Sequence, residues 1–276
     1  MIKHFREIHK MMRNFEPARL AVVNPQQEYL QNVIAKAKEK GIIEPLVFLN
    51  DDPAIAAIEA VEAAASGKAD LLMMGDIDTA QLISIVMKKD YGLRTDTLFS
   101  YVAVLETPFY NRLMLCSDGG INIKLNEETV PAIVENALSL ASSLGIQQPN
   151  LAFLSLVETI TPKLPSTKLW KKMTKKYKSD NRLTAEGPLP LDVALSANAA
   201  ERKSIQSNIA GKVNIFIGPT ITSINMMAKA LMIVGGAKGG SLILGAKCPI
   251  ILLSRSDSRR TNMNSIALGL LALNRN

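Results

Sequence analysis

The chain of 276 residues is 47% apolar and 21% charged, a composition that excludes a disordered or collagen-like protein and provides for a substantial core. Its net charge of +7 favours anionic partners, and the aromatic content of 5% is too low for a surface that stacks nucleic acid bases, so we expect phosphorylated small molecules. The apolar runs are shorter than the about 18 residues of a membrane span, and Met1–Phe15 lacks the apolar stretch of a signal peptide. We therefore expect a cytoplasmic protein that binds neither nucleic acid nor membranes.

Short apolar runs alternate along the chain with longer segments whose apolar residues recur at helical spacing. The apolar runs are predicted to be buried strands at Leu20–Val23, Leu46–Leu49, Leu71–Met74, Tyr101–Leu105, Leu151–Leu154, Val213–Ile217, Leu242–Leu244 and Ile250–Leu253. The longer segments are predicted to be helices at Gln27–Lys40, Asp52–Ser66, Thr79–Lys89, Glu127–Leu144, Ser223–Val234 and Ser258–Leu273. This alternation indicates an α/β fold with a mainly parallel sheet that helices cover on both faces.

The sequence offers few groups for covalent or metal-assisted catalysis. His4 and His9 are the only histidines and lie in the N-terminal segment, which argues against a Ser-His-Asp or Cys-His nucleophile system. Cys116 and Cys248 are predicted to be buried free thiols, and no zinc-binding spacing of cysteine and histidine occurs, so we expect no metal site. The chemistry should therefore depend on hydroxyl groups, carboxylates, cationic side chains and backbone dipoles.

The segment after the predicted strand Ile250–Leu253 carries the strongest indication of a functional site. Ser254–Ser258 reads Ser-Arg-Ser-Asp-Ser and leads into a predicted helix. Ser258 or Asp257 could cap this helix, whose first N–H groups attract an anion, and the planar guanidinium of Arg255 matches a phosphate group. An ordinary capping sequence without a ligand remains an alternative.

Three further polar loops follow predicted strands, at Met74–Thr79, Ser117–Ile123 and Gly218–Asn225. Asp78 is expected to cap the helix after the first of these loops, and Thr222 or Ser223 the helix after the last. Candidate binding residues in or beside the loops are Asp118, Asn122, Asn225 and Lys229, which lies one helical turn beyond Asn225. Because ligands of α/β sheets bind beyond the carboxyl ends of strands, the loops predict one cleft between two lobes.

A series of short motifs extends in order from Ala69 onward. They are Ala69–Gly75, Tyr91–Thr95, Asp118–Ile123, Val157–Thr159, Pro162–Thr167, Glu186–Leu189, Gly235–Lys238, Leu244–Lys247 and Ser254–Ser258. In this order they resemble the phosphate acetyl/butyryltransferase family, and its butyryl-type members in particular. The resemblance implies a two-lobed α/β/α architecture like that of isocitrate and isopropylmalate dehydrogenases, with the active site between the lobes. The first lobe would consist of residues 1–143 and 243–276. The second lobe would be residues 144–242, and it would form the contact in a homodimer.

Members of that family exchange coenzyme A and phosphate on an acyl group: acyl-CoA + phosphate ⇌ acyl phosphate + CoA. The resemblance therefore implies an acyltransferase with coenzyme A as a substrate and no other cofactor, linked in its pathway to an acyl kinase. Ser254 would hydrogen-bond the oxyanion or the thiol, Arg255 would hold the phosphoryl group, and Asp257 is a candidate base. The substrate-binding residues that we expect are Arg94, Asp118, Asn122, Gly187, Asn225 and Lys229.

Three positions depart from the family pattern, and at one of them Thr220 follows Pro219 where the family usually has an acidic residue. Acetyl-type members carry an acidic residue where this chain has Thr261, so Asp257 or a water molecule would accept the thiol proton, or Arg255 would lower the thiol pKa. Ile224 stands where the family has a glycine, and together with Met226 it could form an acyl pocket wider than acetyl, to which Met227 could add. These departures leave open an impaired paralogue that binds coenzyme A or acyl phosphate without turnover. A metal-dependent oxidoreductase of the same fold would need carboxylates and a cofactor loop that these motifs do not supply.

Overall fold

The computed structural model describes residues 2–254 and 257–273 and divides into two compact units. The central unit consists of Ser100–Lys238 with the residues up to His4, and the terminal unit consists of Phe5–Phe99 with the described residues from Gly239 onward. The lobes predicted from the sequence, 1–143 plus 243–276 and 144–242, differ from these units mainly in residues 100–143. That stretch belongs to the central unit because its second strand pairs with a later strand of the same unit.

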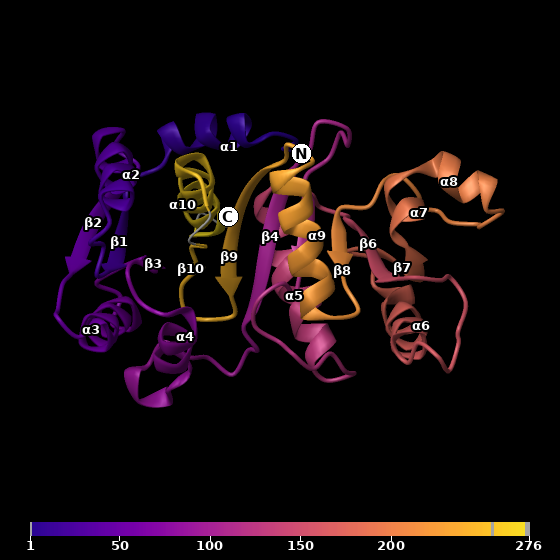
Figure 1. The fold of residues 1–276 in the computed structure, drawn as a ribbon, viewed down its shortest axis with the longest axis horizontal. Helices are drawn as coiled ribbons and strands as arrows, with labels where there is room; N and C mark the ends of the chain where they lie inside the picture. Colours follow the sequence, from indigo (N-terminus) through magenta and orange to yellow (C-terminus); the bar gives the residue numbers. More distant parts are fainter. Residues whose placement is uncertain (1, 255–256, 274–276) are drawn as a thin grey trace. The chain divides into compact units, whose positions relative to one another are not determined.

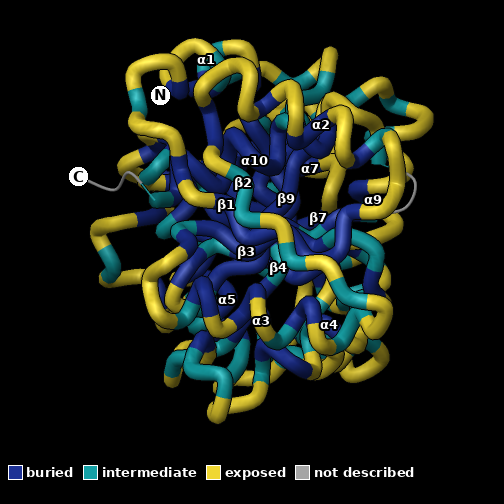
Figure 2. The backbone as a smooth tube through the Cα atoms, turned by 90° about the vertical axis from the view of Figure 1, so that its left-hand side faces the viewer, coloured by how far each residue is buried: buried dark blue, intermediate teal, exposed yellow. Residues whose placement is uncertain are grey.

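The terminal unit is a mainly parallel sheet with helices between its strands (Figure 1). Its elements are α1 (Phe5–Met11), η1 (Met12–Asn14), β1 (Ala18–Val23), α2 (Glu28–Glu39), β2 (Ile43–Phe48), α3 (Pro53–Ala65), β3 (Leu71–Met73), α4 (Thr79–Met87), η2 (Lys89–Tyr91), β9 (Lys238–Leu244), β10 (Ile250–Ile251) and α10 (Arg259–Leu273). The strand order is β2-β1-β3-β10-β9, and β9 alone among these described strands is antiparallel to its neighbour β10. β1 and β3 are almost entirely buried, as expected for parallel strands covered on both faces (Figure 2).

Chain direction and capping residues explain how the helices of this unit are arranged. The chain moves outward from β1 to β2 and then back past β1 to β3, so right-handed crossovers put α2 and α3 on opposite faces. α2 packs with α10, and α3 packs with α4. Asp78 caps α4 by accepting hydrogen bonds from the N–H groups of Ala80 and Gln81, at 2.9 and 3.2 Å, which confirms the prediction for this loop.

The central unit combines an antiparallel strand pair with a parallel set. Its elements are β4 (Ser100–Glu106), β5 (Met114–Ser117), α5 (Thr129–Ser143), β6 (Asn150–Ser155), α6 (Ser166–Lys176), η3 (Tyr177–Ser179), β7 (Thr184–Pro190), α7 (Leu191–Leu195), α8 (Ala197–Arg202), β8 (Ile215–Ile217) and α9 (Ile221–Ile233). The strand order is β4-β5-β8-β6-β7, antiparallel between β4 and β5 and parallel in the remainder. Its core includes Trp170, which is fully buried and stacks on Phe153 with a ring separation of 5.1 Å.

The structure confirms the α/β class and adds elements that apolar periodicity did not predict. β7 was missed because a glycine and two prolines interrupt its apolar residues, and α7 and α8 are too short to show a helical period. Thr220 caps α9 by accepting from the N–H of Ser223 at 3.1 Å, so the prediction of Thr222 or Ser223 as the cap was wrong by two to three residues. None of the helices in the described ranges is long and apolar enough to cross a bilayer.

Both cysteines are free and buried, as predicted. Burial raises the pKa of the Cys116 thiol to about 12. The pKa of the Cys248 thiol also rises to about 12, and burial is the main cause. In the unfolded chain a thiol has a pKa of about 8.5. Above that pH the unfolded state releases protons that the folded state retains, so we expect the free energy of unfolding to fall as pH rises from about 8.5 toward 12.

This prediction is checked by urea unfolding at a series of alkaline pH values, together with thiol alkylation at pH 8. We expect alkylation of neither thiol in the native protein and of both in urea. Rapid alkylation of the native protein would contradict the burial of these thiols.

Candidate active site

The turn after β10 lies in the terminal unit and contains the predicted catalytic residues Ser254 and Asp257. The N–H of Ser254 donates to Oδ2 of Asp257 at 2.8 Å, and the N–H of Asp257 donates to the Ser254 carbonyl at 2.9 Å. These two hydrogen bonds close the turn and hold both candidate residues side by side. Arg255, the third predicted catalytic residue, lies outside the described residues.

Ser258 caps α10, which resolves the two alternatives left by the sequence. Its hydroxyl accepts from the N–H of Thr261 at 3.1 Å and lies 3.0 Å from the Thr261 hydroxyl. Thr261 is only 7% exposed, so the side chain at the position where we expect an acidic residue in acetyl-type members belongs to the helix cap here. Asp257 is then the described carboxylate that lies nearest to Ser254 in the sequence.

Tyr29 and Asp76 accompany this turn, and the sequence did not single them out as site residues. Burial raises the pKa of the Tyr29 phenol above its usual value, and the negative charges of Asp76 and Asp257 raise it further. Asp76 also accepts hydrogen bonds from the N–H groups of Gln26 and Gln27, at 2.7 and 2.9 Å, ahead of α2. The polar loop Met74–Thr79 was a signal for Asp76, whereas nothing in the local sequence indicated Tyr29.

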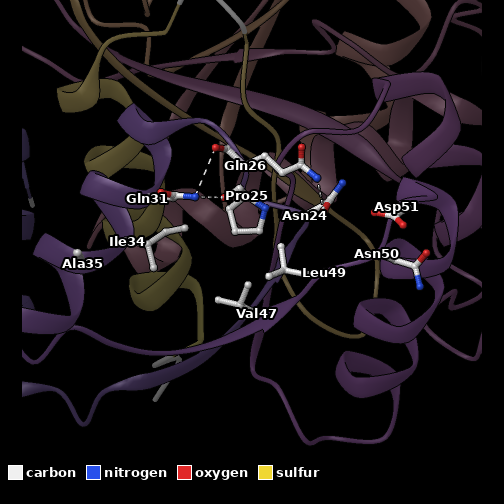
Figure 3. A pocket seen from close by; sticks show the side chains of 10 residues that line it. All are labelled: Asn24, Pro25, Gln26, Gln31, Ile34, Ala35, Val47, Leu49, Asn50 and Asp51. Atoms are coloured by element: carbon white, nitrogen blue, oxygen red, sulfur yellow. Dashed lines mark hydrogen bonds between the residues drawn. The ribbon is translucent and has the colours of Figure 1, made fainter.

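A cavity of about 650 Å³ lies beyond the carboxyl ends of β1 and β2 (Figure 3). Gln31 crosses one wall and donates to the carbonyl of Pro25 at 2.9 Å, and Gln26 donates to Oδ1 of Asn24 at 3.3 Å. Apolar side chains, among them Leu49, line the opposite part. Asp51 adds a carboxylate to these amide and apolar groups, and none of the predicted site residues lines the cavity.

Arg94 lies in the connection that follows η2, with its side chain exposed. Thr95 donates from its hydroxyl to the Gly245 carbonyl at 2.5 Å, and the N–H of Lys247 donates to the Leu93 carbonyl at 3.1 Å. This connection is therefore fixed to the β9–β10 turn, which precedes β10, whereas Ser254 follows β10. Arg94 itself donates to the Met87 carbonyl at 3.3 Å.

In the central unit, Asp118 organises the loop that follows β5. Its carboxylate is fully buried and accepts from the N–H groups of Gly120 at 2.8 Å, Ile121 at 3.0 Å and Asn122 at 3.1 Å. The Asn122 amide and the N–H of Tyr101 also donate to it. A carboxylate with this many internal donors shapes the loop, and direct contact of Asp118 with a substrate stays a prediction.

The loop after β5 meets the start of α9. Asn225 donates from its amide to the Gly119 carbonyl at 2.9 Å, so the structure brings Asn225 next to the loop that holds Asp118 and Asn122. Lys229 is exposed one turn further along α9.

Ile224 is buried between two glycines, Gly119 and Gly218. Only 1% of it is exposed, and a Cβ built on Gly218 would lie 2.3 Å from Ile224 Cγ1. A Cβ built on Gly119 would lie 3.1 Å from Ile224 Cγ2. The side chain therefore fills the space left by these glycines, whereas Met226 is 65% exposed. The sequence prediction of an acyl pocket at Ile224 does not hold for that residue.

Replacing Ile224 with alanine should lower the free energy of unfolding by about 2–5 kcal/mol, because the facing glycines have no side chains to fill the cavity. Urea unfolding followed by the fluorescence of Trp170, the single tryptophan, reports on the same unit. Met226→Ala, on the exposed side of the same helix, is the control and should change stability by less than about 0.5 kcal/mol. Equal losses in both variants would contradict the packing role of Ile224.

Gly187 lies within β7 at a close approach to β6. A Cβ at this position would stand 2.5 Å from Cβ of Phe153, and the Gly187 carbonyl accepts from the Thr174 hydroxyl at 3.0 Å. The pairing of β6 and β7 shifts register between Ala152 and Leu154, beside this contact. Strand packing accounts for a glycine here, and no described contact assigns it a ligand.

Comparisons with known proteins agree on one family. The sequence profile described as phosphate acetyl/butaryl transferase matches residues 5–270. A phosphate butyryltransferase of Clostridium acetobutylicum is 35% identical over 98% of each chain, and a phosphate acetyltransferase of Thermotoga maritima is 32% identical over 91% of this chain and 93% of its own. The solved structure of a branched-chain phosphotransacylase from Enterococcus faecalis V583 has a TM-score of 0.85 and 30% identity, and covers 94% of this chain and 100% of its own.

A more distant solved structure shares the fold alone. A 4-hydroxythreonine-4-phosphate dehydrogenase from Klebsiella pneumoniae has a TM-score of 0.51 at 12% identity, and covers 97% of this chain and 87% of its own. This similarity confirms the dehydrogenase-like architecture that the motifs implied.

Proposed function

This chain belongs to the phosphate acetyl/butaryl transferase family, and from this membership we propose that it transfers a short- or branched-chain acyl group between coenzyme A and inorganic phosphate. That it is an acyltransferase follows from the family, whose relatives here are named phosphate butyryltransferase or phosphate acetyltransferase. The preference for a butyryl or isobutyryl group rests on one observation, the 35% identity with a phosphate butyryltransferase over 98% of both chains. The similarity to a branched-chain phosphotransacylase supports it.

The proposed reaction is a direct transfer. In the direction of acyl-CoA formation, the thiol of coenzyme A loses its proton, its sulfur bonds to the acyl carbon, and the carbon–oxygen bond to the leaving phosphate breaks through a tetrahedral intermediate. Thioesters and acyl phosphates are already activated, so positioning of the two anionic reactants can supply about 7–11 kcal/mol of the required barrier reduction.

Asp257 is our candidate for the base that accepts the thiol proton. Its carboxylate is oriented by the N–H of Ser254, which donates to Oδ2 at 2.8 Å. Thr261 cannot take this role, since its hydroxyl accepts no proton at neutral pH and is engaged with Ser258.

Ser254 and Arg255 are proposed to stabilise the developing charges. The hydroxyl of Ser254 would donate to the oxyanion, a contact that typically contributes about 3–4 kcal/mol to the transition state. By resemblance to the family, Arg255 would hold the phosphoryl group through its planar guanidinium. Arg255→Ala should therefore greatly reduce turnover.

The central unit is proposed to contribute binding groups from α9. Asn225 and Lys229 would contact the substrate, while Asp118 and Asn122 position the loop to which the Asn225 amide donates. Arg94, whose side chain is exposed, would meet a phosphate of coenzyme A. The family resemblance also motivates a homodimer.

The experiment that tests the proposal is release of free coenzyme A from acetyl-, butyryl- and isobutyryl-CoA, measured with and without inorganic phosphate. We expect phosphate-dependent release, fastest with the butyryl or isobutyryl thioester. A preference for acetyl-CoA would overturn the chain-length assignment. Absence of release across the panel, with protein that unfolds cooperatively in urea, would overturn the proposed function.

A further inference from the structure

A second cavity, of about 870 Å³, lies among the helices of the terminal unit. α1, η1, α2 and α10 surround it, and α1 and α2 both pack on α10 (Figure 1). The cationic side chains that line it are Arg13, Lys36, Lys40, Arg259 and Arg260, joined by His9. Among the described residues, no aspartate or glutamate lines this cavity.

These five cations lack a carboxylate partner in the part of the chain that the structure describes. Two arginines elsewhere in the described chain do pair with carboxylates, Arg19 with Asp70 at 2.5 Å and Arg182 with Glu135 at 2.7 Å. Within the described residues, no salt bridge to a carboxylate involves any of the five cations of the cavity. Gathering like charges around one hollow raises the local potential, which a multiply charged anion would lower.

Two of the cations lie where a helix disfavours positive charge. Arg259 and Arg260 are the first residues of α10, and no acidic residue accompanies them in that turn. The N-terminal end of a helix carries partial positive charge, so these arginines are expected to reduce stability unless an anion binds there. The Ser258 hydroxyl already accepts from the N–H of Thr261 in this turn, so the arginine side chains are the groups that would meet such an anion.

The floor of the cavity is apolar, and hydrogen bonds hold the helices of its wall together. Met12, Val33 and Ile42 are buried beneath the cations. His9 hydrogen-bonds through Nε2 to Oδ1 of Asn264 at 2.8 Å, and the Asn264 amide donates to the Gly239 carbonyl at 2.9 Å, which fixes α1 against α10. An apolar floor under a cationic rim fits a ligand with a flat or apolar group and several negative charges.

We propose that this cavity binds a free nucleotide polyphosphate, at a site separate from the one that carries acyl transfer. The flat base would lie on the apolar floor, and the phosphates would meet Lys36 of α2, Lys40 directly after this helix, and the arginines of η1 and α10. Coenzyme A carries related chemistry in its phosphorylated adenosine, but none of the residues assigned to the reaction lines this cavity.

The test is calorimetric titration with ATP and with coenzyme A, without magnesium, of the wild-type chain and two variants. Removing two charge-assisted contacts in the Lys36→Ala/Lys40→Ala variant should weaken ATP binding at least about tenfold. Lys38→Ala, an exposed lysine on the same helix that does not line the cavity, is the matched control and should leave ATP binding unchanged. Coenzyme A binding should be the same in all three proteins.

Arg13→Ala, on a different element of the wall, should weaken ATP binding in the same way. Equal ATP affinities of the wild type and the double variant would overturn the proposal. An equal loss of coenzyme A affinity in the double variant would also overturn it, because the cavity would then be part of the coenzyme site. Neither binding measurement depends on turnover. The proposed acyl transfer could therefore be disproved while the nucleotide site is still supported.

Discussion

Asp257→Asn is expected to lower kcat/KM for phosphate-dependent acyl transfer by about two to four orders of magnitude, the usual contribution of a positioned base. Asparagine retains an oxygen that can accept from the N–H of Ser254, so the turn after β10 should keep its shape. What is lost is the capacity to accept the thiol proton. The measurement is steady-state kinetics with butyryl-CoA and phosphate, and with butyryl phosphate and coenzyme A.

The pH profile separates this role from a structural one. Wild-type kcat/KM should fall as pH decreases and the carboxylate becomes protonated, whereas the variant should lose that dependence. Glu62→Gln, an exposed carboxylate on α3, provides a control and should behave as the wild type. Wild-type kinetics in Asp257→Asn would assign the proton transfer to water or to the effect of Arg255 on the thiol.

Asp118→Ala is expected to cause the largest loss of stability among the variants considered. The carboxylate is fully buried and accepts from four backbone N–H groups, which would lose their acceptor. The donating residues are half-buried, except for the exposed Gly120, where water can replace the lost acceptor. A donor left without an acceptor away from water costs about 1–3 kcal/mol, so even one or two of them are a large share of the about 5–15 kcal/mol of a typical domain. We expect a strongly lowered urea midpoint by Trp170 fluorescence.

Asp118→Asn is the matched variant because it keeps one acceptor oxygen but turns an NH₂ group toward donors. Its midpoint should fall between those of the wild type and Asp118→Ala. Catalysis should decline in both, since the Gly119 carbonyl that holds Asn225 belongs to the same loop. A wild-type urea midpoint for Asp118→Ala would show that the loop does not need its buried acceptor.

Prediction from the sequence succeeded where structure depends on neighbouring residues. Asp78 and Ser258 cap their helices through hydrogen bonds to groups two or three residues away, and such caps are visible in the order of residue types. It was less successful for α9, whose cap Thr220 lies two residues before the predicted Thr222. Both Thr220 and Ser223 take part in a reciprocal capping arrangement, and residue types alone do not assign the two roles.

The sequence by itself determined the α/β class, the strand-end location of Ser254 and Asp257, and the family, because periodicity, capping residues and ordered motifs are local properties of the chain. Only the tertiary structure decided that Ile224 is buried, that Tyr29 lies near the charges of Asp76 and Asp257, and that α1, α2 and α10 gather cations around one cavity. These features join residues that are tens to hundreds of positions apart. Their contacts follow from strand order and helix packing, which no local pattern encodes.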